Sequence, residues 1–76
     1  MSIESAKAFF MRVTHDEDFR KSVGEIATVE QRIEYVKAAG FEFSNQDLYN
    51  AIYDINARYP GRYMTEKGLK DRGIVF

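Results

Sequence analysis

Apolar side chains recur at the spacing of an α-helix in four stretches of the chain, and this pattern predicts an all-α fold. The first stretch follows Ser2, a residue type that commonly caps a helix. Its apolar face consists of Ile3, Ala6, Phe9, Phe10 and Val13. The pattern breaks at residues 14–16, where Asp16 is placed to cap a second, shorter helix that ends near Gly24. The apolar face of that helix consists of Phe19, Val23 and Ile26.

The third and fourth stretches also begin at capping residues. Thr28 and Gln31 have the spacing of a capping box, and so do Ser44 and Asp47. The third helix is expected to bury Val29, Ile33 and Val36. The fourth helix is expected to bury Leu48, Ala51, Ile52 and Ile55 and to stop before Pro60, because the residue before a proline avoids helical angles.

The link between these two helices lies in the segment KAAGFEFSNQDL, residues 37–48. Gly40 can end the third helix in a left-handed conformation, and Ser44 can start the next helix at once. Phe41 is expected to pack back onto the helix that it follows. Phe43 is placed to form a hydrophobic staple with Leu48, while Glu42 points to water. We therefore predict a structural role for Gly40, Phe41, Phe43, Ser44 and Leu48.

Charge divides the chain into a helical domain, residues 1–57, and a basic, aromatic C-terminal extension, residues 58–76. The first part carries six basic and ten acidic residues, a net charge of −4, and the second carries five and two, a net charge of +3. Thr65 can cap a helical turn over residues 66–71, although Gly68 weakens it. The apolar residues 74–76 can dock on the domain or on another molecule. The expected architecture is a compact bundle of three to four short helices with a partly irregular basic tail.

The residues that usually carry catalysis are sparse. The chain has no cysteine, no glycine-rich phosphate loop and no G-x-S-x-G nucleophile motif. His15, the single histidine, has only Asp16 and Asp18 beside it, and a solvated loop in which Asp16 caps a helix explains these residues better than a metal site does. We expect no enzyme, no cofactor and no metal. The sequence also has neither a signal peptide nor an apolar run of about 18 residues, so we expect a cytoplasmic protein without a membrane partner.

Two aromatic features have more than one interpretation. Tyr49, Tyr53 and Asn56 follow one another at helical spacing, and they either widen the buried face of the fourth helix or form an exposed strip for a partner. In the segment RYPGRYM, residues 58–64, arginines alternate with tyrosines, as in proteins that bind single-stranded nucleic acid. The isoelectric point near 5.8 argues against nucleic acid. A tail that packs its tyrosines onto the domain is the simpler alternative.

From these features we predict a contact surface for another protein, formed by Tyr49, Tyr53, Arg58, Tyr59, Arg62 and Tyr63. The large amount of aromatic surface would also suit a homodimer.

Four sequence motifs resemble those of one family. They are S-x-E-x-x-K-x-F-F at residues 2–10, D-x-x-F-R at residues 16–20, T-x-E at residues 28–30 and A-A-G-F-E-F-S-x-x-D-L at residues 38–48. In this combination, over about residues 1–53, the chain resembles the nitrogen-fixation-associated Nif-eleven family. That family also supplies the leader regions of some ribosomally made, post-translationally modified peptides.

The resemblance implies two functions. Stand-alone members occur in nitrogen-fixing bacteria, which suggests an adaptor whose partner is a nitrogenase component or an assembly factor. Leader members are bound by a modifying enzyme and usually end in a double glycine before a core peptide rich in Cys, Ser or Thr. This chain has no double glycine, and beyond Pro60 it has no cysteine or serine and only Thr65. We therefore favour the adaptor and keep the leader-type precursor as the alternative. The resemblance implies no catalytic residue.

Overall fold

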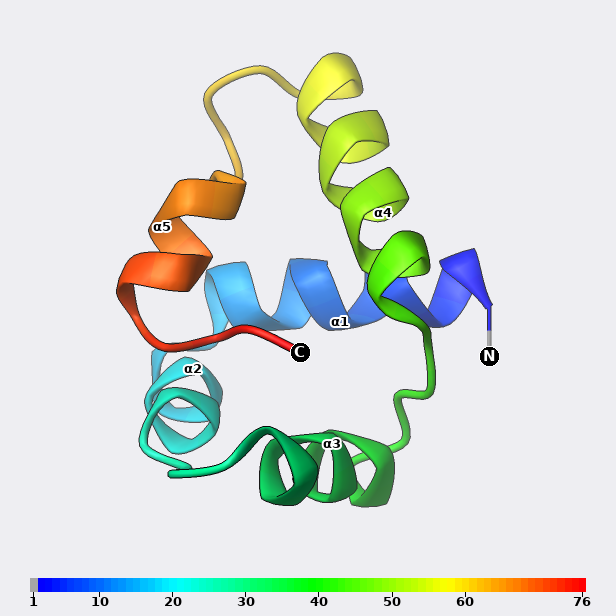
Figure 1. The fold of residues 1–76 in the computed structure, drawn as a ribbon. Helices are drawn as coiled ribbons and strands as arrows, with labels where there is room; N and C mark the ends of the chain where they lie inside the picture. The colour runs from blue at the N-terminus through cyan, green and yellow to red at the C-terminus, as the bar shows by residue number, and fades with distance from the viewer. Residues whose placement is uncertain (1) are drawn as a thin grey trace.

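The computed structural model describes residues 2–76, and all regular elements within them are helical. The helices are α1 (Ile3–His15), α2 (Glu17–Gly24), α3 (Val29–Ala38), α4 (Asn45–Arg58) and α5 (Glu66–Asp71) (Figure 1). The predicted all-α fold is confirmed. The turn predicted over residues 66–71 forms the fifth helix.

Each helix starts at a side-chain cap that the sequence predicted, because each cap oxygen accepts a hydrogen bond from an otherwise unpaired amide. In each case the cap accepts a hydrogen bond from the amide three residues further along the chain. Ser2 accepts from Ser5, Asp16 from Phe19, Thr28 from Gln31, Ser44 from Asp47 and Thr65 from Gly68. Asp16 also ends α1, since its own amide donates to the Arg12 carbonyl at 2.8 Å. The chain therefore turns from α1 into α2 within one residue.

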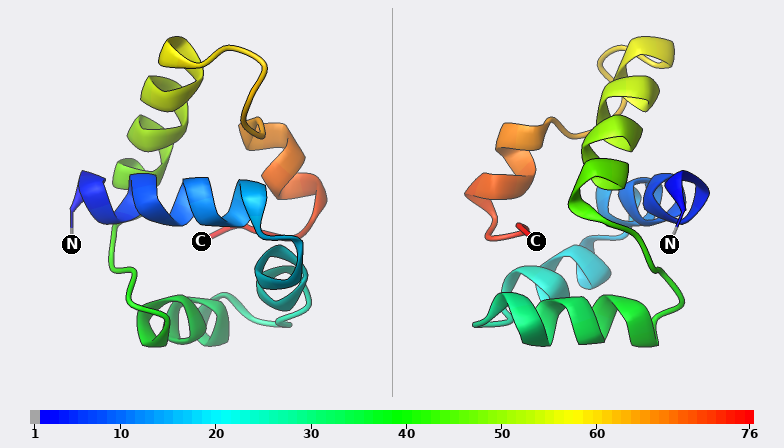
Figure 2. Two further views of the ribbon diagram at one scale, coloured as in Figure 1. Left: turned by 180° about the vertical axis from the view of Figure 1, so that it is seen from behind. Right: turned by 45° about the vertical axis from the view of Figure 1, so that its right-hand side comes forward.

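Helix α1 is the centre of the fold. It packs against α4 and α2, and α2 in turn packs against α3; Figures 1 and 2 show α1 crossing between α4 and the α2–α3 pair. Its apolar face is fully buried at Phe9, Phe10 and Val13, as predicted. Helix α4 buries the four predicted positions Leu48, Ala51, Ile52 and Ile55.

The link from α3 to α4 has the predicted backbone. Gly40 has φ +99°, a value that side-chain-bearing residues rarely adopt. The amide of Phe41 donates to the Val36 carbonyl at 3.1 Å and that of Gly40 to the Lys37 carbonyl at 3.0 Å, which is the Schellman pattern of a helix end. The link is also tied to the start of α1. The Glu42 amide donates to Ser5 Oγ at 2.8 Å.

The aromatic side chains of the link fix it to the core, as predicted. The ring of Phe41 lies 5.9 Å from that of Phe9 and 6.0 Å from that of Phe19. The ring of Phe43 lies 5.1 Å from that of Phe9. Leu48 is buried in the same core, and the staple between Phe43 and Leu48 stays a prediction. Ser44 and Asp47 form the reciprocal capping box.

The predicted buried face of α3 is wrong at two of its three positions. Val36 is buried, but Val29 and Ile33 are 38% and 47% exposed, and Arg32 is buried instead at 5% exposure. The prediction rested on the three apolar positions and on the rule that a charged residue faces water. Arg32 can face inward because its aliphatic stem covers apolar surface while its guanidinium finds carbonyl partners.

These partners show where the C-terminal residues lie. Arg32 donates to the Ile26 carbonyl at 2.8 Å and to the Val75 carbonyl at 2.6 Å. Ile74 is buried. The Phe76 ring lies 5.5 Å from that of Phe9 and packs against the hydrophobic core. Residues 74–76 thus dock on the helical domain, which is one of the two outcomes that the sequence left open.

Candidate functional site

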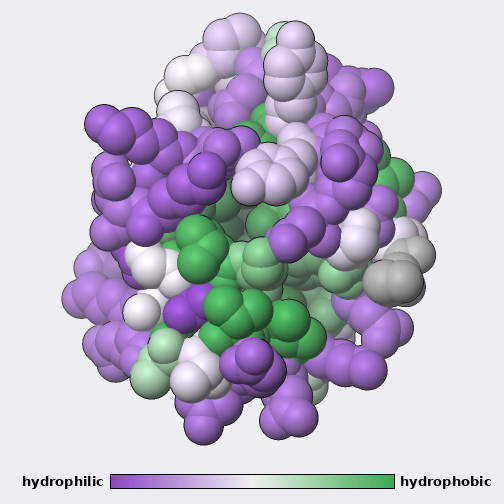
Figure 3. All heavy atoms as spheres, viewed as in Figure 1, coloured by the Kyte–Doolittle hydropathy of each residue, from purple (hydrophilic) through white to green (hydrophobic). Residues whose placement is uncertain are grey.

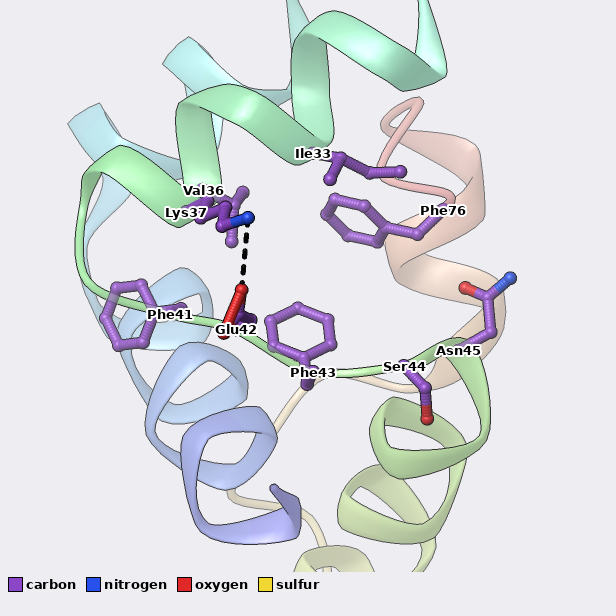
Figure 4. A pocket seen from close by; sticks show the side chains of 9 residues that line it. All are labelled: Ile33, Val36, Lys37, Phe41, Glu42, Phe43, Ser44, Asn45 and Phe76. Atoms are coloured by element: carbon purple, nitrogen blue, oxygen red, sulfur yellow. Dashed lines mark ion pairs between the residues drawn. The ribbon is translucent and has the colours of Figure 1, made fainter. Parts of the chain in front are cut away.

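An open groove of about 570 Å³ lies between α3, the link and the C-terminal residues. Its lining combines apolar residues with polar ones. The apolar residues are Ile33, Val36, Phe41, Phe43 and Phe76, and the polar residues are Lys37, Glu42, Ser44 and Asn45. Figure 4 shows Ile33 and the rings of Phe43 and Phe76 around the hollow, with Phe41 at the other end of the link. We call this the corner groove.

Two distant parts of the sequence form the apolar wall of the corner groove. The rings of Phe43 and Phe76 meet edge to face, with 5.6 Å between their centroids. Both rings also contact Phe9 of α1, which holds them against the core. Each ring of the wall therefore packs against two other aromatic rings.

An ion pair between Lys37 and Glu42 borders the groove. Lys37 Nζ lies 3.2 Å from Glu42 Oε2, and both side chains are more than half exposed (Figure 4). The hydrogen bond from Lys37 and its positive charge lower the pKa of the Glu42 carboxyl below its usual value. Lys37 and Glu42 therefore neutralise each other, and the groove itself carries little net charge.

Exposed apolar residues extend the groove along the surface. Val29 and Ile33 lie one turn apart on α3, and Val75 is exposed beside the bound guanidinium of Arg32. Figure 3 shows apolar residues gathered between α3 and the C-terminal end on this face. This site was not predicted from the sequence. Ile33 was expected to lie in the core, and the link residues were expected to have only a structural role. The local signal was the pair of phenylalanines in the link.

The six predicted contact residues, which we call the tyrosine surface, form two groups in the structure. Tyr49 and Tyr53 are 43% and 81% exposed, so the alternative in which they widen the buried face of α4 is wrong. With Asn56, they line a second hollow of about 550 Å³ between α4 and the start of α5. Lys70 lies over the Tyr49 ring, with Nζ 6.0 Å from its centroid.

The other predicted contact residues lie around the end of α4. The Tyr63 ring packs 5.7 Å from that of Phe10, and Tyr59 is half-exposed with its ring 6.0 Å from that of Tyr63. Arg58 Nε is 3.6 Å from Asp54 Oδ2, and Arg62 is exposed. Tyr63 thus packs onto the helical domain, whereas Tyr59, Arg58 and Arg62 remain on the surface.

The His15 region forms an aromatic contact. The imidazole of His15 lies 5.0 Å from the Tyr63 ring, edge to face. Asp16 accepts from the Phe19 amide, and this bond lowers the pKa of the Asp16 carboxyl. Across residues 2–76, no three His, Cys, Asp or Glu side chains gather closely enough to hold a metal ion.

Comparison with known families places the corner groove in context. The model of the Nif11 domain matches residues 1–48, which is more than half of the chain. The chain belongs to the Nif11 domain family. This confirms the resemblance inferred from the four motifs. Eight of the nine residues that line the corner groove lie inside the matched range, and Phe76 lies outside it.

The tyrosine surface lies outside the match, since Tyr49 is the first residue after it. No curated protein and no solved structure matches the chain significantly. Within the described residues, none of the helices combines the length and the apolar character needed to cross a membrane.

Proposed function

We propose that this Nif11 domain is a non-enzymatic binding module, and that another protein docks an apolar segment in its corner groove. The observation that carries the proposal is the open groove beside the exposed side chains of Val29 and Ile33. Contiguous exposed apolar surface on a small soluble domain commonly marks an interaction site. The aromatic wall adds support, because aromatic side chains are enriched in protein–protein interfaces.

The position of the groove within the chain also supports this proposal. Most of its lining comes from residues 1–48, the part of the chain that the family match covers. Binding through the groove would therefore belong to the Nif11 domain itself. Binding through Tyr49 and Tyr53 would belong to the part of this chain that follows the match.

We further propose a cytoplasmic adaptor linked to nitrogen fixation, with a nitrogenase component or an assembly factor as its partner. Affinity capture with the tagged chain, from cells grown with and without fixed nitrogen, tests this link. Enrichment of such a partner only during fixation is the expected result. Enrichment of a peptide-modifying enzyme or an exporter would favour the alternative below.

A purified partner then tests the groove directly. Ile33→Asn places a polar amide on the exposed wall of the groove and should lower the affinity at least about tenfold, the effect of losing one apolar contact of about 1.4 kcal/mol. Met11→Asn is the matched control, because Met11 is also an exposed apolar residue but lies on α1, outside the groove. Equal affinities of the two variants would contradict docking in the groove.

The tyrosine surface is a second proposed contact of the same partner. The double variant Tyr49→Ala and Tyr53→Ala removes its two exposed rings on α4. If the variant keeps its circular dichroism spectrum and its affinity for the purified partner, this surface takes no part in binding.

The alternative function is that of a leader-type precursor bound by its modifying enzyme. The observation that favours it is the membership in the Nif11 family, which is known for leader-like domains. The intact mass of the protein from its native host separates the two functions. A cleaved or dehydrated species would favour the precursor, whereas an unmodified full-length chain would favour the adaptor.

A further inference from the structure

The exposed side of α3 presents two parallel rows of side chains. Val29 and Ile33 form an apolar row, and Glu30 and Glu34 form an acidic row beside it, each pair spaced four residues apart. At 1.5 Å of rise per residue, the members of each row are separated by about 6 Å along the helix axis. All four side chains are exposed.

The acidic row is not neutralised within the described residues. Neither Glu30 nor Glu34 forms an ion pair there. In the other four helices, an acid in the helix or at its end pairs with a basic residue four positions away. Two like charges at this spacing destabilise a helix slightly. The only lysine on α3, Lys37, pairs with Glu42 of the link instead. The uncompensated charge beside the corner groove is therefore negative.

The fold also restricts the conformation of an occupant. Residues 2–76 form helices and connecting segments, so an extended peptide would find no strand edge on which to continue a sheet. An amphipathic helix needs no main-chain partner, and it recognises a groove through apolar side chains at i, i+3, i+4 and i+7. A helix lying along α3 would reach Val29, Ile33 and the groove in succession.

We infer that the corner groove and α3 bind an amphipathic helix with basic flanks. Its apolar side chains contact Val29 and Ile33, and its lysines or arginines contact Glu30 and Glu34. This inference rests on the proposed function and adds the chemistry of the partner. A second copy of the chain fits less well, because most basic side chains of its helices already pair with acids of the same chain. Lys7, Arg12, Lys21, Arg58 and Lys70 all do so.

Three synthetic helical peptides of about 15 residues, long enough to populate a helix, test the inference. They share one leucine face and carry lysine, glutamine or glutamate at the flanking positions. Fluorescence anisotropy with the full chain should rank the affinities in the order lysine, glutamine, glutamate. The difference should shrink as salt is added, because ions screen exposed charges.

Charge variants of the chain locate the contact. Glu30→Gln with Glu34→Gln should weaken binding of the lysine peptide at least about threefold and leave the glutamine peptide unchanged, as expected for two exposed ion pairs. The matched control is Asp18→Asn with Glu25→Gln, which removes the same charge from exposed positions outside the groove. If both double variants weaken binding equally, the attraction is non-specific and the inference is wrong.

The remaining outcomes separate this inference from the proposed function. If the three peptides bind equally but Ile33→Asn abolishes binding, the charge inference is wrong and docking in the groove stands. If no peptide binds but Ile33→Asn still weakens binding of the purified partner, the occupant is not a helix of this kind. Docking of a partner in the groove then stands. A dimer in sedimentation that Ile33→Asn abolishes would assign the groove to a second copy and overturn the inference. If neither peptide nor partner responds to Ile33→Asn, both proposals fail.

Discussion

Arg32 Nη1 donates a 2.6 Å hydrogen bond to the carbonyl of Val75, which joins α3 to a residue 43 positions further along the chain. The guanidinium also donates to the Ile26 carbonyl, and within residues 2–76 it forms no ion pair with a carboxylate. Arginine suits this position because its planar fork can donate to two carbonyls at once. Arg32 therefore holds in place the C-terminal residues, of which Phe76 lines the corner groove.

Replacement of Arg32 should loosen these residues. Arg32→Met keeps much of the aliphatic stem but removes both hydrogen bonds, so we expect a loss of about 1–3 kcal/mol in the free energy of unfolding. Urea unfolding measures the loss, and amide exchange at Ile74 should accelerate more than at Phe10. Gln31→Met, a change of an exposed side chain on the same helix, is the control. Unchanged exchange at Ile74 would show that Arg32 does not hold the C-terminal residues.

Gly40→Val should destabilise the chain by at least about 1 kcal/mol, because a β-branched residue is strained at positive φ. A Cβ at Gly40 would meet no atom within 4 Å, so the loss comes from the backbone and not from a clash. Gly40→Asn should lose less, since asparagine tolerates the left-handed region better. Thermal unfolding measures both, and equal stabilities of the two variants would contradict the explanation.

Gly24→Ala tests a close approach between α2 and the C-terminal residues. A Cβ at Gly24 would lie 2.6 Å from the carbonyl oxygen of Arg72, a contact that requires one backbone to shift. Overpacking of this kind costs about 1–3 kcal/mol in unfolding free energy. Ser22→Ala, an exposed change on the same helix, should have little effect in the same urea titration. Equal unfolding midpoints for the two variants would mean that the approach is looser than in the structure.

The ion pair between α1 and α4 should make stability depend on pH. Lys7 Nζ lies 2.7 Å from Asp54 Oδ2, and this hydrogen bond lowers the pKa of Asp54 below its ordinary value of 3.8. A lowered pKa means that the unfolded chain binds the proton more readily, so the contribution is complete above pH 3.8 and disappears as the pH falls through the folded value.

Unfolding of the wild type and of Asp54→Asn at several pH values measures this contribution. The difference between them should be constant near neutral pH and shrink below about pH 4. The change should be smaller in a Lys7→Met background, where the main partner of Asp54 is absent. A difference that does not vary with pH would show that the pair does not stabilise the fold.

Features that depend on a few neighbouring residues could be predicted from the sequence. The caps Ser2, Asp16 and Ser44 and the left-handed Gly40 were predictable because a cap bonds to an amide three residues away and a helix ends on its own last turn. The apolar faces of α1 and α4 were predictable because their large aliphatic and phenylalanine side chains recur at helical spacing.

Tertiary structure alone decided which side of α3 is buried and where the groove lies. The apolar residues of α3 offer two faces, and burial of Arg32 is favourable only when the carbonyl of Val75 arrives to accept its hydrogen bond. With Arg32 buried, Ile33 is exposed and lies beside Phe76, and both side chains line the groove. Helical periodicity reports which residues share a face, but it cannot report which distant segment covers that face.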